Sequence, residues 1–290
     1  MKFISEYNKE ELRLKSKATN LREKIIKMIY LGKDGHVGPS LTLAEIISCL
    51  YFKILNIKSE DPKWENRDRV ILSKGHACPA LYSALIEKGI IQEKEISSLR
   101  KIDSILQGHP DSNKTPGIDV TSGSLGNGLS LGVGVALSGK IDDKDFKTFV
   151  IMGDGELNEG VVWEAIMTAS KYKLSNLIVF IDRNKYQSSG GTEEVMPLEP
   201  LREKFNAFNW NVYEINGNSI KEILEVIDGL ERNDKPHMII ASTIKGYGIS
   251  FMENNNKWHK CVICEKDYDL AMKELDKQRE QIKKEFDRCE

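Results

Sequence analysis

The stretch between Asp154 and Asn184 limits the fold of this chain more than any other part of its sequence. One apolar run, 149–152, ends just before Asp154, and a second, 177–181, ends shortly before Asn184. The residues between the runs include four apolar positions at helical spacing: Val162, Ala165, Ile166 and Ala169. This pattern is typical of a strand-helix-strand crossover in a parallel sheet. We therefore expect an α/β fold.

Asp154 and Asn184 are expected to lie close together although 30 positions (184 minus 154) separate them. A right-handed crossover brings the carboxyl ends of both strands to one edge of the sheet, where ligands of open α/β sheets bind. A carboxylate and an amide oxygen suit a hard cation such as Mg²⁺, which completes its shell with phosphate oxygens and water. The pair therefore indicates a metal site that holds a diphosphate. The alternative is a plain Asp-Gly turn and an ordinary strand exit.

The length and composition favour a globular α/β protein with a substantial core. Hydrophobic residues make up 40% of the 290 positions, enough for such a core. We expect a single domain that comprises residues 1–290 and ends in a charged helical tail at 265–290. The alternative is two smaller domains. The net charge of −2 gives no reason to expect nucleic acid or an anionic membrane as partner. No apolar run reaches about 20 residues and the first residues lack a signal-peptide core, so we expect a cytoplasmic protein.

The five cysteines are expected to be reduced thiols, because their number is odd and they do not form a disulfide framework. Cys261 and Cys264 form a single Cys-x-x-Cys pair. A structural zinc site needs four ligands, and His259 and Cys289 could complete one only by accident.

The rest of the chain alternates predicted helices and strands. A long amphipathic helix is expected to end near Gly32, and Thr42 with Glu45 offers a capping box to the next helix. Further helices are expected at about 79–88, 93–101, 131–136, 200–208, 219–230 and from Tyr268 onward. Strands are expected at 69–73 and 238–241, with 212–215 at a sheet edge and 186–196 as a loop.

Glycine-rich loops carry most of the histidines. His36, His76 and His109, three of the five histidines, each follow a glycine in an expected loop. The loop 121–128 leads into a helix, where backbone N–H groups and the helix dipole could face an anion.

These motifs, in this order, resemble the thiamine diphosphate-binding half of transketolases, and the match runs from the first helix to about His259. They are Gly-His-Val-Gly at 35–38, Ser-Lys-Gly-His-Ala at 73–77, Gly-His-Pro at 108–110, Ser-Gly-Ser-Leu-Gly-Asn-Gly at 122–128, Gly-Asp-Gly-Glu-Leu-Asn-Glu-Gly at 153–160, Asp-Arg-Asn at 182–184, Ile-Lys-Gly-Tyr-Gly at 244–248 and Trp-His at 258–259. The resemblance implies the diphosphate-binding fold, a parallel sheet with helices on both faces.

The resemblance also implies roles for individual residues. Mg²⁺ or Ca²⁺ would be bound by Asp154, Asn184 and the backbone carbonyl of Tyr186. The residues expected to contact thiamine diphosphate are His76, Gly123, Ser124, Leu125, Gly153, Asp154, Gly155, Glu156, Asn184, Lys245 and His259. The expected catalytic residues are His36, His76, His109 and His259, which would line the substrate channel, and Glu159, which would lie near the cofactor's pyrimidine at a dimer contact. An ordinary helix-start carboxylate is the alternative for Glu159.

The implied reaction transfers a two-carbon ketol unit from a ketose phosphate to an aldose phosphate. Transketolases also use a pyrimidine-binding domain, and only 31 residues follow His259 (290 minus 259). We therefore expect an α2β2 assembly with a separate C-terminal subunit. The alternatives are a subunit of a deoxyxylulose-phosphate synthase or of a 2-oxoacid dehydrogenase, and a regulatory subunit that binds the cofactor without catalysis.

Three features depart from the family pattern. Arg183 precedes Asn184 where Asn or Tyr is commoner, and Lys260 follows His259 where the family usually has glycine. The segment 261–264 is unfamiliar.

Overall fold

Five parallel strands form the centre of the protein, and the computed structural model describes residues 2–288. In spatial order the strands are β1 (Arg69–Leu72), β2 (Thr148–Gly153), β3 (Leu177–Arg183), β7 (His237–Ser242) and β6 (Asn211–Asn216). The predicted strands are confirmed, and β6 is an edge strand as its alternating pattern indicates. The predicted crossover is β2, α6 (Gly160–Lys171) and β3.

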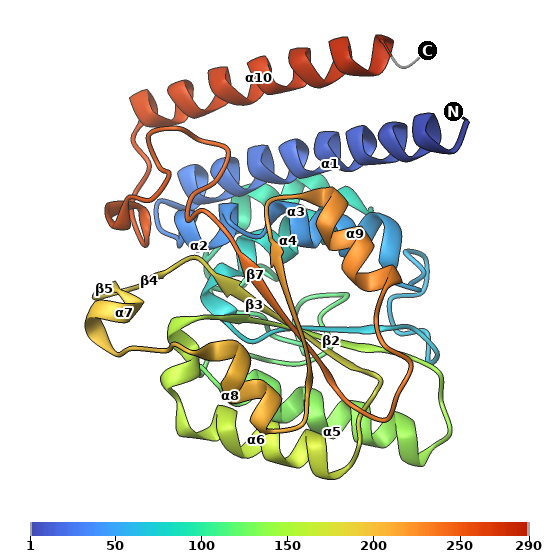
Figure 1. Cartoon of the computed structure of the whole chain (residues 1–290). Coiled ribbons are helices and arrows are strands. Elements are labelled where there is room, and N and C mark those ends of the chain that lie inside the picture. Colours follow the sequence, from blue (N-terminus) through green and yellow to red (C-terminus); the bar gives the residue numbers. More distant parts are fainter. Residues whose placement is uncertain (1, 289–290) are drawn as a thin grey trace.

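Helices cover both faces of the sheet (Figure 1). One face carries α5 (Asn127–Ile141), α6 and α8 (Leu201–Ala207); the other carries α1 (Lys2–Gly32), α3 (Ala44–Cys49), α4 (Cys78–Glu87) and α9 (Ile220–Asp228). Strand β2 supplies Phe149 and Ile151 to the core under α1, and Val150 and Met152 to the core under α5 and α6. Successive side chains point to opposite faces, so a strand buried on both sides reads as a continuous apolar run.

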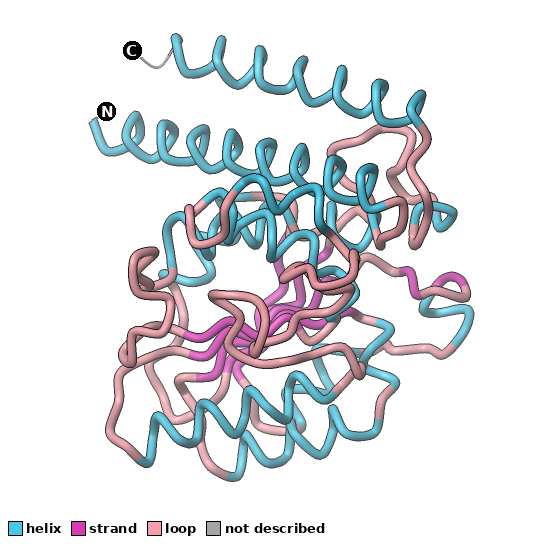
Figure 2. Tube along the Cα trace, turned by 180° about the vertical axis from the view of Figure 1, so that it is seen from behind, coloured by secondary structure: helices cyan, strands magenta, loops and turns pink. Residues whose placement is uncertain are grey.

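The last helix, α10 (Glu265–Asp287), lies along α1 as an outer layer (Figures 1 and 2). Tyr268 stacks on Tyr30 with 4.3 Å between ring centroids, and Arg279 forms an ion pair with Glu23. Ala271 and Leu275 are buried. The charged helix expected at the end of the chain is therefore packed against the protein by one narrow apolar face.

The predicted capping box at Thr42 and Glu45 is wrong. The Thr42 hydroxyl donates instead to the Gly38 carbonyl at 2.8 Å, and the Glu45 carboxylate accepts from Arg22 Nη2 at 2.6 Å. This region begins with the short helix α2 (Val37–Leu41), and α3 runs on into the π-helix η1 (Leu50–Ile54). A buried cation from α1 thus binds the glutamate in place of the helix terminus.

Two other expected segments differ in detail. The helix expected at 93–101 is the 3₁₀-helix η3 (Glu93–Ser98), and Arg100 beyond it has a left-handed backbone with φ of 61°. The expected loop at 186–196 contains a small hairpin, β4 (Tyr186–Gln187) and β5 (Gly190–Gly191), and the helical turn α7 (Thr192–Val195). Three further 3₁₀ turns lie near the sheet edge: η2 (Gly75–Ala77), η4 (Gly155–Asn158) and η5 (Asn256–Trp258).

Within residues 2–288, no helix has the length and apolar character needed to span a bilayer. Cys49, Cys78, Cys261 and Cys264 are free thiols, whereas Cys289 lies outside the described residues.

Candidate functional site

A cavity of about 590 Å³ lies at the carboxyl ends of β1, β2 and β3. Every residue that the sequence suggests for the site lines it except Ser124. Ser124 is exposed, and its carbonyl accepts from the Asn127 backbone N–H at 3.3 Å at the start of α5. The sheet edge thus gathers residues from segments that are far apart in sequence.

Asp154 and Asn184 lie together at this edge, as the crossover predicts. Asp154 Oδ2 accepts from the Lys185 backbone N–H at 2.7 Å, and Oδ1 accepts from the Gly155 N–H at 2.8 Å. Asn184 Oδ1 accepts from the Tyr186 N–H at 3.0 Å. Backbone N–H groups therefore fix both side chains at the ends of β2 and β3.

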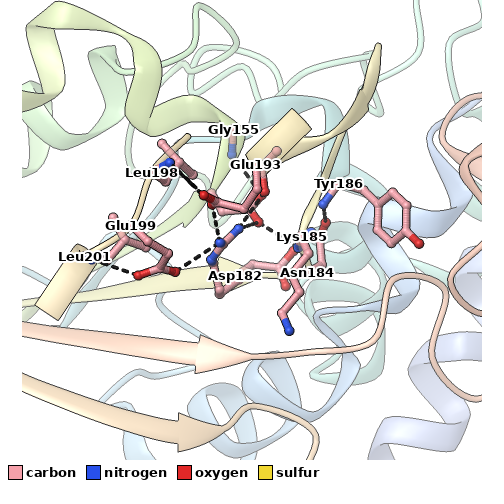
Figure 3. Close-up of polar contacts among 12 residues, drawn as sticks. Gly155, Asp182, Asn184, Lys185, Tyr186, Glu193, Leu198, Glu199 and Leu201 are labelled. Atoms are coloured by element: carbon pink, nitrogen blue, oxygen red, sulfur yellow. Dashed lines mark hydrogen bonds and ion pairs between the residues drawn. The ribbon is translucent and has the colours of Figure 1, made fainter. Parts of the chain in front are cut away.

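Arg183 is the main neighbour that the sequence interpretation missed. Its Nη1 donates to Asp154 Oδ2 at 2.9 Å and to Thr192 Oγ1 at 2.6 Å, and its Nη2 pairs with Glu193 and with Glu199. Figure 3 shows these two glutamates converging on one guanidinium. Arg183 is 4% exposed. It therefore ties the segment 192–199 to Asp154, and its only signal in the sequence was its departure from the family pattern.

Opposing influences act on the pKa of the Asp154 carboxyl group. Burial, together with the nearby Asp182, raises the pKa of Asp154 to about 6, while Arg183 and the Lys185 N–H act in the opposite direction. A cation close to Asp154 Oδ1 would favour the ionised carboxylate.

The donor set fits a hard cation only with help from a ligand. The described residues contain no group of three or more His, Cys, Asp or Glu side chains that could hold a metal ion. Asp154, Asn184 and the Tyr186 carbonyl supply one carboxylate, one amide oxygen and one peptide oxygen. Such a set resembles a Mg²⁺ site that needs phosphate oxygens and water to complete an octahedron. These residues therefore fit a metal bridged to a diphosphate.

Lys74 lines the cavity, and although it belongs to the Ser-Lys-Gly-His-Ala motif, the sequence interpretation gave it no role. Its ammonium group pairs with the buried Asp182 and donates to the Pro39 carbonyl at 3.1 Å. Asp182 also accepts from Asn184 Nδ2 at 2.7 Å. This ion pair links the segment after β1 to β3, and through Asp182 it helps to fix the side chain of Asn184.

The glycine-rich loop before α5 binds one of the protein's own carboxylates. Glu156 Oε1 accepts from the Gly126 N–H at 2.6 Å, and Oε2 accepts from the Gly153 N–H at 3.0 Å. The Ser73 hydroxyl also donates to Glu156. The anion expected at this helix start is therefore Glu156. The loop reaches the cavity through Leu125 and Gly123, whose left-handed backbone (φ 150°) is backed by the ring of His109.

Three histidine rings converge at the other end of the cavity. The ring centroid of His36 lies 4.9 Å from that of His76 and 5.5 Å from that of His259, and His76 and His259 are 5.6 Å apart. His36 Nδ1 is buried and has no hydrogen-bond partner among the described residues. An unpaired buried nitrogen in a polar cavity indicates a position where a ligand can bind.

Burial keeps these imidazoles neutral at pH 7. It lowers the pKa of His36 to about 4 and of His76 to about 2, and nearby lysines add to the effect. Burial and Lys245 lower the pKa of His259 to about 3. Lys245 Nζ lies 2.8 Å from His259 Nδ1, and burial lowers the Lys245 pKa to about 8. Neutral rings can accept as well as donate hydrogen bonds to a sugar hydroxyl.

His109 and Glu159 border the same cavity from other sides. The ring of His109 packs on Gly123, and burial and Arg100 lower its pKa. Glu159 immediately precedes α6, at the helix start that the alternative interpretation gave it, but its side chain makes no capping hydrogen bond to that helix. The side chain is exposed at the edge of the cavity.

Comparison with known proteins shows which proteins this chain is similar to. The family model "Transketolase, thiamine diphosphate binding domain" matches residues 15–285. The chain is 43% identical over 277 residues to one of the subunits of the apulose-4-phosphate transketolase of Phocaeicola vulgatus, covering 95% of this chain and 98% of that protein. It is 40% identical over 272 residues to 6-deoxy-6-sulfo-D-fructose transketolase subunit SqwG of Clostridium sp. (strain MSTE9), covering 93% and 99% respectively.

A solved structure is similar in fold. The transketolase from Campylobacter jejuni superposes with a TM-score of 0.86 at 31% identity, over 91% of this chain and 42% of that chain. The chain therefore spans less than half the length of that transketolase. It has the same extent as the two subunits above.

Proposed function

Because the chain belongs to the transketolase family through its thiamine diphosphate-binding domain, we propose that it is the cofactor-binding subunit of a two-chain transketolase. With a C-terminal subunit it transfers a two-carbon ketol unit from a ketose phosphate to an aldose phosphate. The observation that carries this proposal is one cavity with Asp154 and Asn184 at one end and three neutral histidine rings at the other.

At the sheet edge, Asp154, Asn184 and the Tyr186 carbonyl would hold Mg²⁺, or Ca²⁺ in its place. The metal would bridge these oxygens to the diphosphate of thiamine diphosphate, since the protein itself supplies a single carboxylate to the metal. Gly153 and Gly155 leave room beside that carboxylate. A Cβ on Gly155 would lie 2.8 Å from Gln187 Cβ, so glycine is required where the two segments meet.

At the other end, the histidines would handle the sugar. Thiamine diphosphate supplies a nucleophilic carbanion when it is bound. His36 Nδ1 is free to bind a substrate hydroxyl, and Lys245 fixes the His259 ring by its contact at Nδ1. The neutral rings of His76 and His109 can accept a proton from a hydroxyl group of the substrate and later return it to the substrate.

The partner would supply the pyrimidine-binding domain. Two relatives of the same extent are named as subunits, which supports a second polypeptide. The α2β2 assembly of the two chains is part of the proposal. Glu159 is exposed at the edge of the cavity, where a residue at a dimer contact would have to be. The cytoplasmic location expected from the sequence stays a prediction that cell fractionation would test.

Calorimetric titration of thiamine diphosphate into the chain, with and without Mg²⁺, tests the cofactor part of the proposal. We expect saturable binding that is lost in EDTA and regained with Mg²⁺. Binding that is equally strong in EDTA would contradict the metal bridge. A regulatory subunit would bind the cofactor in the same way but would give no ketol transfer with its partner.

A further inference from the structure

The two carboxylate oxygens of Asp154 differ in the hydrogen bonds that they accept. Oδ2 accepts two, from Arg183 Nη1 at 2.9 Å and from the Lys185 N–H at 2.7 Å. Oδ1 accepts one, from the Gly155 N–H at 2.8 Å. Because a carboxylate oxygen has two lone pairs, both positions on Oδ2 are taken and one on Oδ1 is open. Asp154 can therefore offer a metal ion one oxygen and not both.

The guanidinium of Arg183 also binds two carboxylates from the segment after β3. Its Nη2 lies 2.5 Å from Glu193 Oε1 and 3.0 Å from Glu199 Oε1. Figure 3 shows both side chains turned toward it. Backbone groups hold the two glutamates as well, because the Leu198 N–H donates to Glu193 and the Leu201 N–H donates to Glu199. One arginine thus contacts three carboxylates whose positions are fixed.

Glu193 lies beside the expected metal ligands. It lines a second cavity, of about 540 Å³, whose wall also includes Asn184 and Tyr186. Those two residues line the cofactor cavity too. A carboxylate in this place could serve a large cation as a further ligand, but its charge is already compensated by Arg183.

The other buried acid at this edge is also occupied. Asp182 forms an ion pair with Lys74, and it accepts from Asn184 Nδ2 at 2.7 Å and from the Thr243 hydroxyl. Its side chain is fully buried. The carboxylate of Asp182 therefore serves the protein's own donors, and Asp154 is left to provide charge to a metal.

Arg183 is itself held firmly in place. It is almost fully buried, and its Nη1 donates to Thr192 Oγ1 at 2.6 Å as well as to Asp154. Thr192 is buried at the start of α7. The guanidinium therefore cannot turn away from Asp154 without losing its contacts with the hydroxyl and with both glutamates.

Mg²⁺ and Ca²⁺ require different sets of ligands. Mg²⁺ takes a near-ideal octahedron of oxygens, usually with one or two carboxylates, and is completed by phosphate oxygens and water. Ca²⁺ is larger, takes about six to eight oxygens, and often binds a carboxylate through both of its oxygens. A site that offers one carboxylate oxygen, one amide oxygen and one peptide oxygen suits Mg²⁺ better.

We propose that Arg183 is a positioning residue that makes the metal site select Mg²⁺ over Ca²⁺. It acts through Asp154, whose Oδ2 it occupies, and it withholds Glu193 and Glu199 from the metal. The inference rests on the proposed cofactor-binding function, which by itself admits either ion. Since Asn or Tyr is commoner at this position in the family, the selectivity is a property of chains that carry the arginine.

The test compares the apparent Kd values of the two ions. Mg²⁺ and Ca²⁺ are each titrated by calorimetry into the full chain at a fixed excess of thiamine diphosphate. Wild type should bind Mg²⁺ about tenfold more tightly than Ca²⁺. Arg183→Met should shift the ratio of the two Kd values about tenfold toward Ca²⁺, because Asp154 Oδ2 and the two glutamates become available. Arg183→Lys keeps a charged donor and should shift the ratio less.

Two matched controls separate the arginine from its surroundings. Arg202→Met removes an exposed arginine that pairs with Glu214, and it should leave both Kd values unchanged. The double variant Glu193→Gln, Glu199→Gln keeps Arg183 on Asp154 while removing two negative charges near the site. It should weaken the binding of both ions by a similar factor and leave their ratio unchanged.

The proposal is wrong if wild type binds Mg²⁺ and Ca²⁺ equally tightly, a result that depends on no variant. It is also wrong if folded Arg183→Met, checked by circular dichroism, loses affinity for both ions by the same factor, as a general loss of structure would cause. If Arg183→Met does not fold, the wild-type ratio decides. A wild type without any metal-dependent cofactor binding would contradict the proposed function as well, which distinguishes the two failures.

Discussion

Arg183 Nη1 and Asp154 Oδ2 form a buried ion pair with 2.9 Å between the two atoms, at the edge of the sheet where a metal would bind. The pair connects the chemistry of the site with its stability. The carboxylate has a guanidinium on one oxygen, and only a backbone N–H on the other. A metal at the free side of Oδ1 and the guanidinium of Arg183 would both compensate the same buried charge.

We expect Arg183→Gln to destabilise the protein by about 3–5 kcal/mol, because it leaves the Asp154 carboxylate buried without a cation. Mg²⁺ with thiamine diphosphate should restore part of this loss, since a ligand of the native state stabilises by mass action. Thermal denaturation with and without both ligands measures the effect. Arg202→Gln, which removes an exposed pair with Glu214, is the control and should cost about 0–1 kcal/mol. An equal loss with and without ligands would argue against a metal at Asp154.

Asp154→Ala should weaken the metal-dependent binding of thiamine diphosphate at least 10- to 100-fold. Changes to groups that merely orient metal ligands already cost about that much. Calorimetry on folded protein gives the affinity, and circular dichroism confirms the fold. If wild type and variant bind the cofactor equally well, Asp154 is not a metal ligand.

Alanine at His36, His76 or His109 should lower ketol transfer by the reconstituted enzyme and leave the melting temperature nearly unchanged. These rings face the cavity and are not packed in a core, so little buried apolar contact is lost. The fifth histidine offers a contrast, because His237 is 3% exposed within β7 and hydrogen-bonds near the sheet edge. His237→Ala should lower the melting temperature but keep the activity per folded molecule. If alanine at a cavity histidine instead lowers the melting temperature and keeps the activity per folded molecule, that histidine has a structural role.

The depressed pKa of His36 predicts a particular dependence of stability on pH. In the folded protein the pKa is about 4, whereas an unfolded histidine titrates near 6.5, so only the unfolded chain gains a proton between these values. The free energy of unfolding should therefore fall as pH drops from about 6.5 to about 4. Asp154, whose pKa is raised to about 6, contributes with the opposite sign over part of that range. Comparison of wild type with His36→Gln isolates the histidine, and the variant should show the shallower fall. Parallel curves would mean that His36 is not held neutral.

The frame of the fold and the meeting of Asp154 with Asn184 could be predicted from local periodicity, whereas the other cavity residues were predicted from the resemblance to transketolases. Two buried runs around an amphipathic helix require a crossover, and a crossover places Asp154 beside Asn184. The partners of side chains could not be predicted in this way. Glu45 pairs with Arg22 from α1 and not with the helix start that its position suggested. Glu156 accepts a hydrogen bond from Gly126, 30 positions away, at the start of α5, a contact that no local pattern indicates.

The same limit applies to Arg183. Its contacts with Thr192, Glu193 and Glu199 depend on how the segment after β3 returns to the sheet edge. No periodic pattern in the sequence predicts the path of that segment. An unusual residue in a known motif was the only indication.

The central claim is that this chain is the cofactor-binding half of a two-chain transketolase. The most direct measurement is the initial rate of ketol transfer between sugar phosphates, with thiamine diphosphate and Mg²⁺, for the purified chain alone and together with a C-terminal transketolase subunit. We predict no turnover above background for the chain alone and steady turnover for the assembly. Robust turnover by the isolated chain, or none by an assembly that binds the cofactor, would contradict the claim.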